Sequence, residues 1–146
     1  MSDKTKELNS SIKLVNNRLH FTGSAGSNDP VSIDYTAPLG DDLGYTSLEL
    51  LLLSLSSCLG SAMLTFIRRM NRTITEFEIT AKGVRKTEHP TGFASIHLEI
   101  SLTSPDAIPE EVQNVIDLAE EKYCPVWSMI KGSTNVETSI KINNVR

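Results

Sequence analysis

Three segments in the second half of the chain alternate between apolar and polar residues. They are residues 76–82, 95–102 and 136–142. Alternation with a period of two predicts a β-strand that has one face buried and the other in solvent. The loop 88–92, which contains a proline and a glycine, separates the first two segments, so we expect them to form a hairpin.

The N-terminal part alternates more weakly, over residues 10–22. Asn16-Asn17 lies in the middle of this stretch, and asparagine tolerates the positive φ values of a two-residue hairpin turn. A hairpin with such a turn is therefore expected. Residues 31–35 contain β-branched and aromatic side chains and predict a third short strand.

A long apolar segment lies between these two groups of strands, because residues 50–67 contain no charged side chain. Thr46 precedes Glu49 by three residues, the spacing of a capping box, so a helix should begin there and end near Met70-Asn71. The segment is long enough to span a membrane. However, it contains several serines and a glycine and has charged flanks. We therefore expect a helix buried inside a protein and no membrane as a partner.

A second helical region follows the alternating segments. Pro109 suits the first position of an amphipathic helix. The expected apolar face consists of Val112, Val115, Ile116, Ala119 and Tyr123. Cys124-Pro125 ends this helix and begins a short one, which should run to about Lys131 and be ended by Gly132.

The predicted order of elements is β-β-β-α-β-β-α-α-β, an α+β fold with residues 1–146 in one domain. The central helix is apolar on nearly every face, and one antiparallel sheet buries only one face of a helix. Two copies of the chain that pack these helices together would bury the rest. We therefore expect a homodimer.

Composition and charge narrow the choice of partners. The chain has 146 residues, 39% of them hydrophobic and 22% charged, and a formal net charge of −4. This modest acidic balance, without a Lys/Arg-rich run, argues against nucleic acid as a partner. Residues 1–7 are polar and lack an apolar signal core, so we expect a cytoplasmic location, where cysteines are normally thiols.

Cys58 and Cys124 are the only cysteines and the main candidates for chemistry. Cys58 lies within the apolar helix, where a cysteine is either an inert core residue or a reactive thiol, and reactivity requires a cation or donor from outside that helix. Cys124 precedes Pro125 and should be the N-cap of the short helix, where backbone N–H groups favour a thiolate. The alternative is a buried cap thiol of ordinary pKa.

Two motifs resemble the OsmC/Ohr family of osmotically inducible and organic hydroperoxide resistance proteins. They are residues 45–58, ending in Ser56-Ser57-Cys58, and residues 121–126, which contain Tyr123-Cys124-Pro125. The form around Leu48 resembles the OsmC-like branch. The resemblance implies an intertwined homodimer with two long central helices wrapped by antiparallel sheet.

The resemblance also implies a thiol peroxidase. Cys58 would attack the peroxide and become a sulfenic acid, and Cys124 would convert that acid to a disulfide. An external dithiol would then reduce the disulfide. Neither metal nor other cofactor is expected, and the three histidines lack the spacing of a metal site.

Two further residues enter through the resemblance. Arg18 lies near the place where peroxidases of the family carry an arginine that stabilises the thiolate, and the alternative, which the sequence slightly favours, is a solvated charge on a hairpin. Glu49 lies near the family glutamate that orients this arginine, but Leu48 occupies the matching position. At about 100° per residue Glu49 falls on the helix face opposite Cys58, and capping explains it.

The leading hypothesis is a cytoplasmic, homodimeric peroxidase that prefers organic hydroperoxides, since an apolar pocket rewards burial of an alkyl tail. Trp127 and Met129 pack their helix or line that pocket. One alternative is a non-catalytic protein that binds a small apolar ligand. Another is a redox sensor, in which the disulfide between the two cysteines changes the conformation.

Overall fold

The computed structural model describes residues 7–145, in two compact units. One unit ends at Leu51 and the other begins at Leu52. Each is described by itself below, and the single domain over residues 1–146 stays a prediction. Most of the polar segment 1–7, from which a cytoplasmic location was predicted, lies outside the described residues.

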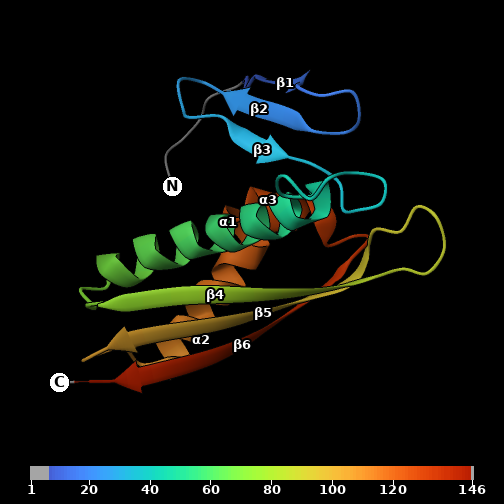
Figure 1. Ribbon diagram of the computed structural model, residues 1–146. Coiled ribbons are helices and arrows are strands. Elements are labelled where there is room, and N and C mark those ends of the chain that lie inside the picture. The colour runs from blue at the N-terminus through green and yellow to red at the C-terminus, as the bar shows by residue number, and fades with distance from the viewer. Residues whose placement is uncertain (1–6, 146) are drawn as a thin grey trace. The chain divides into compact units, whose positions relative to one another are not determined.

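The N-terminal unit contains a three-stranded antiparallel sheet of β1 (Ser10–Leu14), β2 (Phe21–Ala25) and β3 (Val31–Ile33), in that order (Figure 1). The three predicted strands are confirmed, but the predicted two-residue turn is wrong. Residues 15–20 connect β1 to β2, and the side-chain oxygen of Asn16 accepts hydrogen bonds from the N–H groups of Arg18 (2.9 Å) and His20 (3.1 Å).

The physical reason is that the Asn16 side chain closes a longer loop by accepting these hydrogen bonds. The residue therefore does not need the left-handed backbone conformation of a two-residue turn. Among the described residues other than glycine, positive φ occurs at Asp42 and Asn71. The second of these positions ends the long helix, as the sequence predicted.

The long helix, α1, runs from Ser47 to Arg69. Its capping box is confirmed: the Thr46 N–H donates to Glu49 Oε1 at 2.9 Å, and the Glu49 N–H donates to Thr46 Oγ1 at 3.2 Å. Hydrogen bonds from the backbone and side chain of Thr46 lower the pKa of the Glu49 carboxyl. The backbone N–H groups of Thr46 and Glu49, at the start of the helix, therefore both have a hydrogen-bond acceptor.

Replacing Thr46 by alanine should lower the free energy of unfolding by about 1 kcal/mol, because the Glu49 N–H loses its acceptor. Urea unfolding followed by circular dichroism measures this change. Thr46→Ser keeps the hydroxyl and is the matched control. Equal stability of both variants and the wild type would show that this cap contributes nothing.

The C-terminal unit contains a second sheet, of β4 (Glu76–Arg85), β5 (Phe93–Ser104) and β6 (Asn135–Asn144), in that order. The predicted hairpin of β4 and β5 is confirmed, but β6 pairs with β5 in parallel, so this sheet is mixed and not antiparallel. A parallel partner requires a crossover connection. That connection consists of α2 (Pro109–Leu118), the π-helical turn η1 (Ala119–Tyr123) and α3 (Pro125–Ile130).

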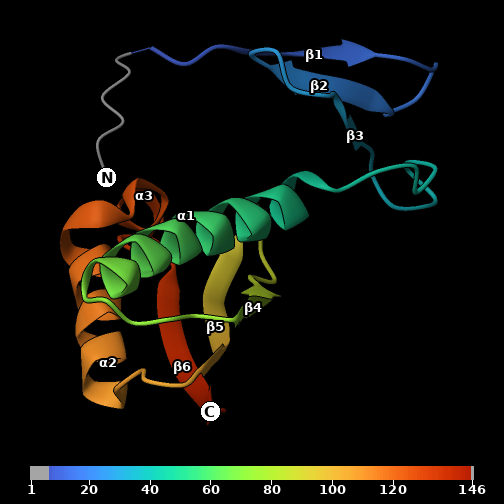
Figure 2. The same cartoon turned by 90° about the vertical axis from the view of Figure 1, so that its left-hand side faces the viewer.

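One face of this sheet carries the core. Along β5 the buried residues alternate with exposed ones and include Ile96, Leu98 and Ile100. The helices lie on this face, as Figures 1 and 2 show. Helix α1 approaches β4 closely at Gly60, where a Cβ atom would lie 3.2 Å from the Phe77 ring.

Only one face of α1 is buried in the chain. Its buried residues are Leu55, Leu59, Gly60, Ala62, Met63 and Ile67. By length and composition alone α1 would also suffice to cross a membrane. This is weak evidence, because core helices of soluble proteins pass the same test.

Candidate functional site

The two cysteines come from different elements of the C-terminal unit and meet. Cys58 lies on α1, and Cys124 lies between η1 and α3. The Cys58 side chain lies near enough to Cys124 to raise the pKa of its thiol. Cys58 is partly exposed, whereas Cys124 is only 1% exposed. The residues that the sequence singled out for thiol chemistry therefore form one site.

The backbone around Cys124 is held from both sides. Its N–H donates to the carbonyl of Ala119 at 2.8 Å, which closes the π-helical turn. Its φ of −111° and ψ of 92° are extended, as the following Pro125 requires. Residues 119–123 were expected to continue the α-helix. A π-helical turn takes the place of this last α-helical turn, and such turns are frequent at functional sites.

An aromatic contact ties this turn to α1. The ring centroids of Phe66 and Tyr123 lie 4.9 Å apart with the rings tilted, and the Arg69 guanidinium lies 5.6 Å from the Phe66 centroid. Tyr123 immediately precedes Cys124, so the contact helps to hold the buried thiol beside the helix that carries Cys58. Sequence reasoning placed Tyr123 on an apolar face but did not find its partner.

The expectation that Cys124 is a stabilised thiolate is wrong. Burial raises the pKa of its thiol to about 12. The N–H groups of Trp127 and Val126 face the sulfur and lower the pKa in part, while the Cys58 side chain raises it further. The predicted N-cap position is confirmed, but neither N–H completes a cap hydrogen bond. The effect of burial on the pKa of Cys124 therefore outweighs the opposite effect of the helix N-terminus.

A buried, protonated Cys124 changes what the pair can do. The protonated Cys124 thiol is a donor beside the Cys58 sulfur. The sequence predicted that Trp127 and Met129 pack their helix or line a pocket. Trp127 is buried, whereas Met129 is 76% exposed. Trp127 therefore packs within the C-terminal unit, whereas the Met129 side chain is exposed in the single chain.

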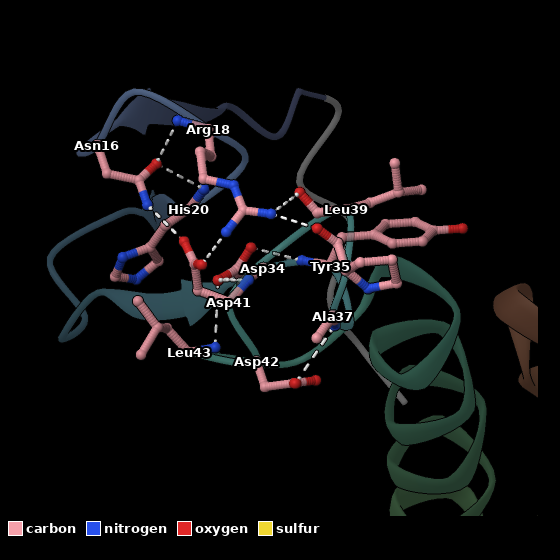
Figure 3. A network of polar contacts seen from close by, with 11 residues as sticks. Asn16, Arg18, His20, Asp34, Tyr35, Ala37, Leu39, Asp41, Asp42 and Leu43 are labelled. Carbon is pink, nitrogen blue, oxygen red and sulfur yellow. Dashed lines mark hydrogen bonds and ion pairs between the residues drawn. The ribbon is translucent and has the colours of Figure 1, made fainter.

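Arg18 and Glu49 belong to the N-terminal unit. The Arg18 guanidinium donates to the Asp41 carboxylate and to the carbonyls of Pro38 and Leu39, the last at 2.9 Å (Figure 3). Arg18 is thus paired within its own unit and is not a free solvated charge. Glu49 serves the capping box. The roles of both residues toward Cys58 stay predictions.

Asp34 organises the loop that binds Arg18, and no sequence signal pointed to it. Its side chain is only 3% exposed, and it accepts hydrogen bonds from the N–H groups of Tyr35 (2.7 Å), Asp41 (3.2 Å) and Leu43 (3.2 Å). Burial by itself raises the pKa of Asp34, but these hydrogen bonds and nearby His20 outweigh it and lower the pKa below its usual value. The carboxylate therefore holds the Asp41 backbone, and Asp41 holds Arg18 (Figure 3).

The described residues contain no group of three or more His, Cys, Asp or Glu side chains that is arranged to hold a metal ion. His97 instead forms a hydrogen bond with Ser139 at 2.9 Å on the exposed face of the second sheet.

Solved structures show the same fold. A hypothetical protein from Aquifex aeolicus VF5 matches with a TM-score of 0.83 and 23% identity, covering 95% of this chain and 98% of that chain. An OsmC-like protein of unknown function from Vibrio cholerae matches with a TM-score of 0.81 and 14% identity, covering 93% and 99%. An organic hydroperoxide resistance protein from Elizabethkingia anophelis matches with a TM-score of 0.71 and 20% identity, covering 98% and 100%.

No curated protein matches this sequence. The family model described as OsmC-like protein matches residues 40–139, which include both cysteines and the elements that bring them together. Together with the shared α+β fold, this match shows that the chain belongs to the OsmC-like protein family.

Proposed function

We propose that this protein is a thiol peroxidase that reduces organic hydroperoxides through Cys58 and Cys124. The observation that carries the proposal is the contact between a partly exposed thiol and a buried, protonated one. A hydroperoxide reaches the exposed sulfur, and the buried thiol is already in place to react with the product.

The two cysteines react one after the other. The Cys58 thiolate attacks the terminal peroxide oxygen, the O–O bond breaks, and the alkoxide leaves as an alcohol after taking up a proton. Cys58 is then a sulfenic acid. The sulfur of Cys124 attacks Cys58, and its proton leaves with the hydroxyl group as water. A dithiol reduces the resulting disulfide to two thiols and is itself oxidised.

Several observations support this choice of reaction. The neighbours of the same fold include organic hydroperoxide resistance proteins from Elizabethkingia anophelis and Bacillus subtilis, at 20% and 19% identity. The residues around the pair, among them Leu55, Leu59 and Trp127, are apolar and buried. Such surroundings favour an alkyl hydroperoxide over hydrogen peroxide.

The proposal includes the roles that the family resemblance implies for other groups. Arg18 stabilises the Cys58 thiolate, Glu49 assists Arg18, and the chain acts as a homodimer in the cytoplasm without metal or flavin. The pairing of Arg18 with Asp41 suits the first role, because an arginine that is already oriented loses less freedom when it binds an anion.

Consumption of cumene hydroperoxide in the presence of dithiothreitol tests the proposal. The wild type should turn over repeatedly, and Cys58→Ser should reduce the rate to background, because serine cannot form the sulfenic acid. Ser57→Ala, on the exposed side of the same helix, is the matched control and should keep the wild-type rate. Arg18→Ala should lower kcat/KM by about a hundredfold if its charge acts on the thiolate.

The outcomes separate the alternatives. Turnover that survives Cys58→Ser contradicts the proposal. A single conversion to the disulfide without turnover identifies a redox sensor, and no reaction of either thiol identifies a ligand-binding protein.

A further inference from the structure

We propose that Tyr123 is a positioning residue for the disulfide: its contact with Phe66 of α1 holds Cys124 at the place from which it reacts with the oxidised Cys58. This inference rests on the pair of cysteines in the proposed function and adds a residue outside the sulfur chemistry. Tyr123 acts through Cys124, the next residue of the chain, and takes no part in the reaction itself.

Tyr123 and Cys124 are consecutive, and both lie against the same helix. The rings of Tyr123 and Phe66 have centroids 4.9 Å apart and are tilted by 59°, which is a favourable geometry for an aromatic pair. Cys124 lies near Cys58, which comes about two turns before Phe66 on α1. The segment therefore meets α1 at two separate places, and the aromatic contact restricts how far Cys124 can turn or slide away from Cys58.

The backbone bonds around Cys124 do not fix its distance from α1. The Cys124 N–H donates to the Ala119 carbonyl at 2.8 Å, and the Cys124 carbonyl accepts from the Ser128 N–H at 3.0 Å. Both bonds shape the passage from η1 into α3. Within residues 7–145, no backbone hydrogen bond joins η1 or Cys124 to α1. Side-chain packing therefore sets the distance, and the pair of Tyr123 and Phe66 belongs to that packing.

The Phe66 ring is itself held on α1. The next residue, Ile67, is 1% exposed, so this part of the helix is anchored in the core. The Arg69 guanidinium, from the following turn of the same helix, lies 5.6 Å from the Phe66 centroid, within the range of a cation–π interaction. An oriented Phe66 ring gives Tyr123 a fixed partner, which a freely rotating ring would not.

Positioning decides between two fates of the oxidised Cys58. Reaction with Cys124 forms the disulfide and releases water, whereas a second peroxide molecule converts the sulfenic acid to the sulfinic acid. The first reaction is intramolecular, so its rate depends on how often the Cys124 sulfur is in position. Loss of the Tyr123 ring should therefore lower this rate by about five- to tenfold.

An equilibrium with glutathione tests the inference without any peroxide. The two protein thiols reduce one glutathione disulfide to two glutathione thiols, and the equilibrium constant measures the effective concentration of Cys124 at Cys58. We expect this constant to fall about five- to tenfold in Tyr123→Ala. It should stay within about twofold of the wild-type value in Tyr123→Phe, which keeps the ring. Acid quench, alkylation with N-ethylmaleimide and mass spectrometry give the ratio of dithiol to disulfide.

Variants at two other positions separate positioning from stability. Phe66→Leu keeps an apolar side chain but removes the aromatic partner, so it should lower the constant in the same direction. Combined with Tyr123→Ala it should cause little further loss, because both changes remove one contact. Ile96→Val weakens the buried core of the second sheet and lowers stability, but should leave the constant unchanged.

A wild-type constant in Tyr123→Ala and Phe66→Leu, or an equal loss in Tyr123→Phe and Tyr123→Ala, would overturn the inference. So would a wild type that forms no disulfide with glutathione. Phe66→Leu alone gives the decision if circular dichroism shows that Tyr123→Ala does not fold. Absence of peroxide turnover in the wild type would overturn the proposed function instead, while the glutathione equilibrium still decides whether Tyr123 positions Cys124.

Discussion

Replacing Cys124 by serine is expected to turn the protein from a repeated catalyst into one that stops after about one turnover. Cys58 would still attack the hydroperoxide, but its sulfenic acid would have no neighbouring thiol. The contact between the two side chains makes their reaction intramolecular, so steady-state turnover should fall by about a hundredfold or more. A second peroxide molecule would then oxidise Cys58 to the sulfinic acid, which dithiols do not reduce.

Mass spectrometry of the Cys58 peptide after a tenfold excess of cumene hydroperoxide, and the number of peroxide molecules consumed per chain, measure this result. Met129→Ala changes an exposed residue of the same short helix and should retain repeated turnover. Wild-type turnover by Cys124→Ser, with Cys58 recovered as a thiol, would show that Cys124 does not resolve the sulfenic acid.

The second large effect concerns stability at alkaline pH. Burial raises the pKa of Cys124 in the folded protein to about 12, above its unfolded value near 9. A raised pKa means that the folded state keeps a proton that the unfolded chain releases, so its contribution to stability is complete below pH 9 and is lost as pH rises toward 12. The loss is at most about 1.4 kcal/mol per pH unit in that window.

Urea unfolding of the wild type and of Cys124→Ala between pH 7 and pH 11 isolates this effect. The difference between the two free energies of unfolding should be constant up to about pH 9 and should then shrink or reverse. Cys58→Ala should show most of the wild-type loss, because burial is the largest cause of the shift. Parallel curves for the wild type and Cys124→Ala would contradict the raised pKa.

The elements that were predicted correctly have strong local patterns. The alternation of residues 95–102 identified β5 and its buried face, and the spacing of Thr46 and Glu49 identified the start of α1. In both cases the signal lies within a few consecutive residues, and a period or a cap is a local property. The motifs at Cys58 and Cys124 were equally local, and the family match over residues 40–139 includes both.

Features that depend on distant partners were missed or wrong. The parallel pairing of β6 with β5 follows from the crossover between them, and a strand pattern does not reveal the direction of its partner. The Asn16 loop depends on a side chain that bonds to the backbone instead of a left-handed turn. Asp34 gave no sequence signal, because its three donors come from a loop that closes only in the folded unit.

The sequence by itself determined the elements, their order and the two thiols, since these depend on periodicity and on the identity of single residues. Only the tertiary structure decided which thiol is accessible and which keeps its proton. The N-cap position of Cys124 favoured a thiolate, but the pKa of a thiol depends on how much water the whole fold leaves around it. Packing of η1 and α3 buried Cys124 beside Cys58, and this burial assigned the two cysteines their different chemistry.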